Sequence, residues 1–122
     1  MKRSLFLAAL SLVAVLTFTS VAGAQKASVA GAQIQQKQAT RTVVIQNFSF
    51  KPAQITVKRG TRVTWINKDM TKHTATASNG AFDSGVLRPG QSYSHTFKTA
   101  GRTNNYHCQI HPSMRGSVTV TR

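Results

Sequence analysis

Hydrophobic and polar residues alternate in short runs after residue 40, and turn-forming residues separate these runs. Alternation with a period of two predicts β-strands, and clusters of glycine, proline and asparagine predict the turns between them. The predicted strands cover residues 42–45, 54–57, 62–66, 74–76, 92–97, 105–108 and 116–121. No window sustains the 3.6-residue period of an amphipathic helix. Seven or eight short strands at this spacing are typical of a two-sheet antiparallel β-sandwich.

The inward-facing positions of these strands predict the hydrophobic core. Large aliphatic and aromatic side chains occupy these positions, and such residues are core residues by default, so we assign them no chemical role. The expected core residues are Val44, Phe48, Phe50, Ile55, Val57, Val63, Trp65, Phe82, Tyr93, Phe97, Val118 and Val120.

The first 24 residues have the three parts of a secretory signal peptide. Residues 1–3 are basic, an apolar run follows over residues 5–18, and Ala-Gly-Ala at residues 22–24 suits a signal peptidase. An uncleaved membrane anchor is the alternative, because about 20 apolar residues can span a bilayer. The strongly apolar run is shorter than that, so we expect cleavage and export to the periplasm or beyond.

Residues 25–40 are small and polar, and they repeat the hexapeptide Ser-Val-Ala-Gly-Ala-Gln that begins at Ser20. A segment without an apolar face cannot bury enough surface to fold, so we expect a flexible low-complexity linker. The predicted organisation is a signal peptide over 1–24, this linker over 25–40 and one domain over 41–122.

The chain is strongly basic. Its net charge of +14 becomes +12 when Lys2 and Arg3 are removed with the signal peptide, and only Asp69 and Asp83 oppose it. This excess suggests an acidic protein or an anionic membrane surface as a partner, or a solvated cationic surface without a specific partner. We expect no nucleic-acid binding, because the basic residues are scattered and not interleaved with aromatic residues.

The single cysteine, Cys108, cannot form a disulfide within the chain. It is a free thiol, an intermolecular disulfide or a metal ligand. His111 and Met114 follow it at steps of three, and His73 precedes it in another loop. Each of these residues alone is usually structural. Together, two imidazoles, a thiolate and a thioether form the soft donor set of a type 1 copper site.

The segment Tyr-His-Cys-Gln-Ile-His-Pro-Ser-Met-Arg-Gly at residues 106–116 resembles the copper loop of the plastocyanin and amicyanin cupredoxins, and its spacing is closest to that of amicyanin. Similar motifs occur upstream at residues 50–52, 60–67, 82–85 and 89–90. The resemblance implies a Greek-key β-sandwich with one copper ion. It also implies the ligands His73, Cys108, His111 and Met114, with His111 facing solvent.

Three features differ from the family pattern. Thr74 stands where many relatives have an asparagine that braces the cysteine loop, and its hydroxyl can donate a hydrogen bond in its place. Asn104 replaces an aromatic residue and one extra residue precedes Tyr106, which predicts a bulge or a looser corner. His95 and His107 are expected to be packed or surface histidines, not ligands.

These observations predict a one-electron carrier that cycles one copper ion between Cu(II) and Cu(I), and not an enzyme. The alternative is a periplasmic copper-binding or trafficking protein without an electron-transfer role. The expected partner is an acidic exported redox protein, such as a cytochrome, a dehydrogenase or an oxidase domain. We also expect a monomer, peripheral contact with an anionic membrane and no nucleic acid.

Overall fold

The computed structural model describes residues 36–122. The expected signal peptide and most of the expected linker lie outside the described residues, so both stay predictions. Within residues 36–122, no helix is long and apolar enough to cross a membrane. The regular secondary structure described over residues 36–122 consists of β-strands, which confirms the all-β prediction.

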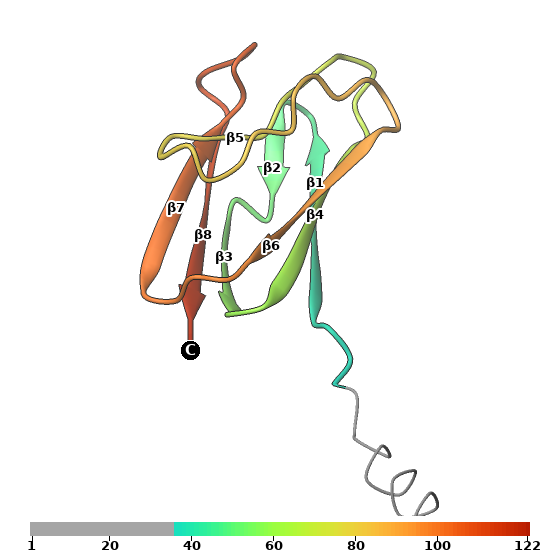
Figure 1. Ribbon diagram of the computed structural model, residues 1–122. Coiled ribbons are helices and arrows are strands. Elements are labelled where there is room, and N and C mark those ends of the chain that lie inside the picture. The colour runs from blue at the N-terminus through green and yellow to red at the C-terminus, as the bar shows by residue number, and fades with distance from the viewer. Residues whose placement is uncertain (1–35) are drawn as a thin grey trace, which may run out of the picture. The chain divides into compact units, whose positions relative to one another are not determined.

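Eight strands form two four-stranded sheets that pack face to face (Figure 1). The first sheet has the order β2-β1-β4-β6 and the second has the order β3-β8-β7-β5. The strands are β1 (Thr40–Gln46), β2 (Ser49–Lys51), β3 (Gln54–Lys58), β4 (Thr61–Asn67), β5 (Thr76–Ala77), β6 (Ser92–Phe97), β7 (Arg102–His107) and β8 (Arg115–Thr121). The predicted sandwich is confirmed, with β1 beginning one residue before the expected domain boundary.

The pairing within each sheet is mixed, whereas the sequence predicted antiparallel sheets. β1 pairs with β4 in parallel, and β3 pairs with β8 in parallel. The other neighbours are antiparallel. A parallel pair requires a long connection between its strands. Here the remaining strands of the sandwich supply that connection.

The first strand buries a different face from the predicted one. Val43 and Ile45 are fully buried, whereas Val44 is only half-buried. Alternate residues of a strand point to opposite faces, so an error of one position exchanges the two faces. Three successive apolar residues gave no signal for choosing between them, and the predicted core position of Val44 is wrong.

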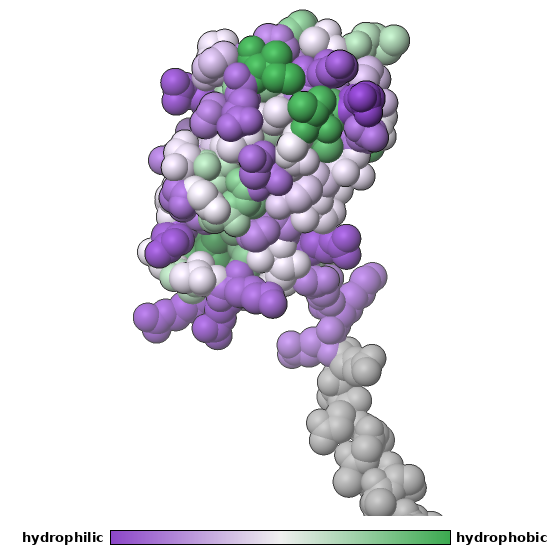
Figure 2. Space-filling model, turned by 45° about the horizontal axis from the view of Figure 1, so that its top comes forward, coloured by the Kyte–Doolittle hydropathy of each residue, from purple (hydrophilic) through white to green (hydrophobic). Residues whose placement is uncertain are grey.

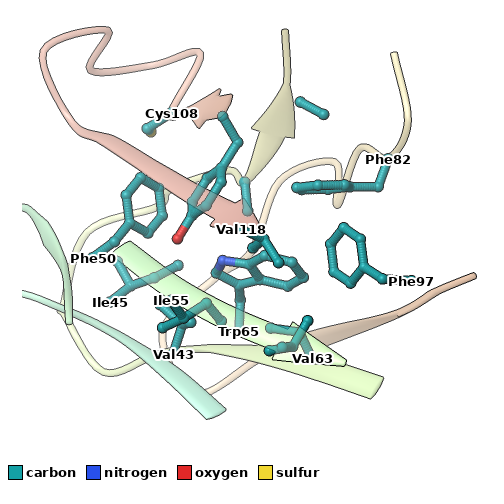
Figure 3. Close-up of a cluster of buried hydrophobic side chains, with 14 of the residues drawn as sticks. Val43, Ile45, Phe50, Ile55, Val63, Trp65, Phe82, Phe97, Cys108 and Val118 are labelled. Atoms are coloured by element: carbon teal, nitrogen blue, oxygen red, sulfur yellow. The ribbon is translucent and has the colours of Figure 1, made fainter. Parts of the chain in front are cut away.

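Trp65 lies at the centre of the core (Figure 3). Its ring stacks on Phe82 at a centroid distance of 4.9 Å and meets Tyr106 edge-on at 5.4 Å. The Trp65 Nε1 and Tyr106 hydroxyl groups are buried without a hydrogen-bond partner. Each such group costs about 1–3 kcal/mol. Burying about 150–250 Å² of ring surface contributes more than this, so packing dominates.

Tyr106 and Gly116 are direct partners on β7 and β8. A Cβ atom on Gly116 would lie 2.5 Å from the Tyr106 hydroxyl oxygen and 2.9 Å from the carbonyl oxygen of Ala53. Only glycine leaves room for the tyrosine ring to cross the strand at this point. The pair closes the core directly beneath the loop that contains Cys108.

β7 pairs with β8 in unbroken register from Arg102 to His107, so the predicted bulge is absent from this strand. Asn104 faces inward and is 2 % exposed. Its Oδ1 accepts a hydrogen bond from Asn79 Nδ2 at 2.8 Å. Because its polar atoms find partners, asparagine can replace an aromatic residue here without distorting the strand.

Candidate metal centre

Three of the four predicted ligands converge at one end of the sandwich. His73 comes from the loop after β4, and Cys108 and His111 come from the loop between β7 and β8. Cys108 Sγ lies 3.7 Å from Nδ1 of His73 and 3.7 Å from Nδ1 of His111, and the two Nδ1 atoms are 3.2 Å apart. Among residues 36–122 this is the one group of at least three His, Cys, Asp or Glu side chains gathered closely enough to hold a metal.

The loop between β7 and β8 is short and closed by its own backbone. The N–H of Cys108 donates to the carbonyl of Met114 at 3.1 Å, and the N–H of Met114 donates to the carbonyl of His111 at 2.9 Å. Cys108 and Met114 are buried, and His111 is half-buried. The loop therefore brings the thiol and the thioether inward and leaves one imidazole partly open to solvent.

His73 is fully buried and is oriented by Asp69. The Nε2 atom of His73 lies 2.8 Å from Oδ2 of Asp69. A carboxylate only accepts hydrogen bonds, so Nε2 carries the proton and the lone pair of Nδ1 faces Cys108. A hydrogen bond of this kind fixes the tautomer and ring orientation of a metal-binding histidine.

Asp69 also holds the turn between β1 and β2. Its carboxylate accepts the N–H groups of Asn47 and Phe48 at 2.7 and 2.9 Å. Partial burial opposes ionisation, but these two bonds and the contact with His73 lower the pKa of Asp69 below its ordinary value. This role of Asp69 was not predicted from the sequence. The signal that could have indicated it is a carboxylate four residues before a predicted histidine ligand.

Phe48 is not a core residue, and the prediction that placed it there is wrong. The side chain is 51 % exposed, and Asn47 and Phe48 both have φ of 54° in a tight turn. Its ring meets the imidazoles of His73 and His111 edge-on, at centroid distances of 5.2 and 5.0 Å. Phe48 thus covers both histidine rings from the solvent side.

Thr74 braces the cysteine loop as its position suggested. Its N–H donates to Cys108 Sγ at 3.3 Å, and its Oγ1 accepts the N–H of Gln109 at 2.8 Å. The hydroxyl therefore acts as an acceptor toward the loop, and not as the donor expected from the sequence.

The other two histidines of the described domain lie outside this group. His95 packs against Phe82 and Phe97, at centroid distances of 5.3 and 4.8 Å. Burial lowers its pKa below the ordinary value. His107 is the last residue of β7 and is half-buried.

The donor set fits copper. Two neutral imidazole nitrogens and one thiolate, 3.2–3.7 Å from one another, can share one ion at bond lengths of about 2 Å. Two nitrogens and a sulfur, with a buried thioether from Met114 nearby in the same loop, are the ligand types of type 1 copper and not of magnesium or calcium.

Comparison with known proteins agrees with this assignment. Residues 8–120 match the family model of the cupredoxin-like domain. The chain is 36 % identical to amicyanin of Paracoccus denitrificans over 83 residues, which are 64 % of this chain and 63 % of that protein. The chain therefore spans less than two thirds of the length of this relative.

Solved structures share the fold. A purple cupredoxin from Nitrosopumilus maritimus is 28 % identical, with a TM-score of 0.60 over 66 % of this chain and 99 % of that one. A copper-containing nitrite reductase from Thermus scotoductus is also 28 % identical, with a TM-score of 0.65, but the match covers 24 % of that enzyme. With the converging ligands and the family match, the chain belongs to the cupredoxin family of blue-copper proteins.

Proposed function

We propose that this protein is an exported one-electron carrier whose single copper ion is bound by His73, Cys108, His111 and Met114. The observation that carries the proposal is the convergence of His73 Nδ1, Cys108 Sγ and His111 Nδ1 within 3.7 Å of one another. The burial of Met114 in the same loop supports its role as the fourth, axial ligand.

Bound copper supplies the change of oxidation state, and the protein supplies a site that changes little with it. Asp69 and Thr74 fix the buried side of the site through His73 and the Cys108 sulfur. Phe48 covers both imidazoles. Electron transfer needs no substrate pocket, only an exposed ligand edge, and half-buried His111 provides one.

The surface around His111 is apolar with a basic margin. All four exposed large hydrophobic residues of the described domain lie on loops at this end: Phe48, Met70, Val86 and Ile110. Figure 2 shows hydrophobic areas at the upper end of the molecule. The flanking Lys68, Lys72 and Arg115 are exposed. An apolar centre with a charged margin suits a transient docking site.

The proposed partner is an acidic exported redox protein, such as a cytochrome, a dehydrogenase or an oxidase domain. Complementary charge at the margin mainly raises the association rate, while the apolar centre sets the docked position. The proposed carrier works as a monomer. It does not bind nucleic acid, because base stacking requires exposed aromatic rings, and the one large aromatic residue exposed in the described domain, Phe48, lies beside the metal site.

Two other functions are separable by experiment. A copper enzyme needs an open coordination position or further metal ligands, and the described domain has one group of candidate ligands. A trafficking protein would bind labile copper with little thiolate-to-copper colour. The amicyanin relative favours the carrier over both alternatives.

The visible spectrum of the copper-loaded protein tests the proposal. Cu(II) should give an intense thiolate-to-copper charge-transfer band, and Cys108→Ser should abolish it. Met114→Leu should keep the colour and raise the reduction potential, because a weak donor to Cu(II) is lost. His95→Gln is the control and should leave the spectrum unchanged. A colourless Cu(II) complex that ignores Cys108 would support the trafficking alternative.

Export is tested separately. Intact mass of the protein isolated from its native source should show a mature chain that starts near Gln25. A chain that retains residues 1–24 and sediments with membranes would contradict cleavage.

A further inference from the structure

Most of the positive charge lies at the end of the sandwich opposite the metal centre. β3 and β8 end there, and β1, β4 and β7 begin there (Figure 1). In Figure 2 several strongly hydrophilic side chains project from this lower end. We call this surface the basic pole. It consists of eight exposed residues: Lys37, Arg41, Lys58, Arg59, Arg62, Lys98, Arg102 and Arg122.

The turn between β3 and β4 joins the two halves of the basic pole. Arg59 N donates to Thr121 O at 2.7 Å, and Gly60 N donates to Phe97 O at 2.7 Å. The turn thereby joins the end of β8 in one sheet to the end of β6 in the other, and the basic residues beside these strand ends form one surface. The chain has two acidic residues, and neither lies at the basic pole. Asp69 is hydrogen-bonded to His73, and Asp83 to Thr76, near the metal centre.

The chemistry of the basic pole points to a polyanionic surface and not to a protein or a single-stranded nucleic acid. Protein interfaces need apolar or aromatic anchors, and all exposed large hydrophobic residues of the described domain lie at the opposite end. Single-stranded nucleic acids need aromatic rings for base stacking, which the basic pole lacks. Clustered lysine and arginine without anchors suit anionic headgroups.

The chain also enters the domain at this pole. Arg62 N donates to Ala39 O at 2.9 Å, and Gln38 Nε2 donates to Gly60 O at 3.2 Å. We propose that the basic pole binds an anionic phospholipid bilayer, so that the metal centre faces away from the membrane and toward its redox partner. This orientation leaves the apolar docking surface free, whether or not residues 1–24 are cleaved.

Vesicle flotation of the full chain tests the proposal. Vesicles of phosphatidylcholine with phosphatidylglycerol should bind the chain more tightly than phosphatidylcholine alone, and the difference should shrink with salt. Each basic residue near an anionic bilayer strengthens binding about fivefold. Reversing Arg59, Lys98 and Arg102 to glutamate should therefore reduce the phosphatidylglycerol-dependent binding by about a hundredfold or more.

A matched triple reversal separates the basic pole from net charge. Lys51→Glu, Lys72→Glu and Arg88→Glu change the charge equally but lie outside the basic pole, so binding should fall much less. Equal losses in both triple variants would overturn the proposal, as would equal binding to both vesicle types. Displacement from vesicles by a single-stranded oligonucleotide at equal anion concentration would overturn the choice of lipid.

A second inference, which rests on the proposed copper site, comes from a chain of hydrogen bonds behind Thr74. Thr74 Oγ1 lies 3.0 Å from Thr76 Oγ1, and Thr76 Oγ1 donates to Asp83 Oδ1 at 3.1 Å. A carboxylate only accepts, so the one hydroxyl proton of Thr76 points at Asp83. Thr74 must then donate its own proton to Thr76, which leaves its lone pairs for the N–H of Gln109.

Every proton in this chain therefore points toward Asp83. Thr74 and Thr76 are 2 % and 8 % exposed, so the bond between their hydroxyl groups is shielded from water, while Asp83 lies at the exposed end of the chain of bonds. Hydrogen bonds in series polarise one another, and a charged acceptor strengthens them. We infer that Asp83 acts through Thr76 and Thr74 as a positioning residue for the cysteine loop, and that its charge favours Cu(II) over Cu(I).

Amide hydrogen exchange of the metal-free protein tests the positioning role independently of copper. Thr74→Val should raise the exchange rate of the Gln109 amide by about tenfold, and Thr74→Ser should restore it. Thr76→Val and Asp83→Asn should raise it by about threefold. Thr103→Val is the matched control, because Thr103 forms a similar hydroxyl pair with Thr119 at 2.9 Å, far from the loop.

In the copper-loaded protein, Thr76→Val and Asp83→Asn should both raise the reduction potential, while Thr103→Val should not. Unchanged Gln109 exchange in Thr76→Val and Asp83→Asn would overturn the relay. Failure to bind copper would count against the proposed function and leave the exchange result intact.

Discussion

The ring of Phe48 stands edge-on to the imidazole of His73, with 5.2 Å between the ring centroids. The same ring meets His111 at 5.0 Å. Phe48→Ala should therefore admit water to both rings and slow electron self-exchange, because a wetter site rearranges more between oxidation states. Since Phe48 is half-exposed, the free energy of unfolding should fall by less than about 1.5 kcal/mol.

Broadening of the NMR lines of the reduced protein on addition of the oxidised protein would measure this rate. Val86→Ala is the control, because Val86 is similarly exposed but makes no ring contact with either imidazole. Equal rates in the Phe48 variant and the wild type would show that the ring does not exclude water from the site.

The carboxylate of Asp69 should make the metal-free fold sensitive to acid. Its pKa is lowered from the ordinary 3.8 in the folded state. The folded state therefore binds fewer protons than the unfolded state in this range, and stability falls as pH drops through and below 3.8. Urea unfolding between pH 2 and 6 should show this loss, and Asp69→Asn should flatten it. The same slope in both proteins would contradict the assignment.

Gly116→Ala should strain the fold through Tyr106. The added Cβ atom would clash with the tyrosine Cζ atom and lie 2.5 Å from the hydroxyl oxygen. Overpacking of this kind destabilises by about 1–3 kcal/mol. Tyr106→Leu, which removes both atoms, should recover part of the loss in the double variant, as urea denaturation of the four proteins of the cycle would show. Additive losses would mean that the tyrosine ring is not the point of contact.

Tyr106 should also weaken the fold at high pH. Burial raises the pKa of its hydroxyl to about 12, from an ordinary value of 10.0. The unfolded state then loses its proton first, so stability is complete below pH 10 and falls between pH 10 and about 12. The free energy of unfolding of Tyr106→Phe should decline less over this range. An identical alkaline decline in the variant would assign the effect to other groups.

Charge reversal at the metal end should slow electron transfer to an acidic partner. Lys72→Glu with Arg115→Glu removes positive charge beside His111, and such charges mainly affect the association rate. The second-order rate constant should fall in the double variant and also with rising salt, with the visible spectrum unchanged. A rate constant that changes neither with the double charge reversal nor with salt concentration would indicate purely apolar docking.

The sequence predicted most strands correctly because alternation and turn residues are local signals. Gln54–Lys58 and Thr61–Asn67 bury Ile55, Val57, Val63 and Trp65 as expected. Ser49–Lys51 was missed because three residues hold too little alternation. Parallel pairing was missed because strand direction depends on distant connections, which no local pattern records.

Three of the predicted ligands, His73, Cys108 and His111, lie together in the structure. They could be proposed from the sequence because their residue types and spacing are typical of a copper site. Their supports were harder to predict. Asp69 reaches His73 only through the loop that follows β4, and Phe48 reaches the imidazoles only because Asp69 accepts its backbone N–H. Such contacts join segments far apart in the sequence and leave no local pattern. Phe48 was therefore assigned to the core because it is a hydrophobic residue beside a strand.

The parallel pairing of β3 with β8 has a consequence for the order of folding. Within the described domain β3 has no other strand neighbour, and Thr121 hydrogen-bonds to Val57, 64 residues earlier. Contacts of such long range form slowly and late. The second sheet therefore cannot assemble until β8 is available. Cys108 lies in the loop between β7 and β8, so its thiol stays accessible to oxidants until the second sheet has formed. The protein must therefore fold and take up its metal before the thiol is oxidised.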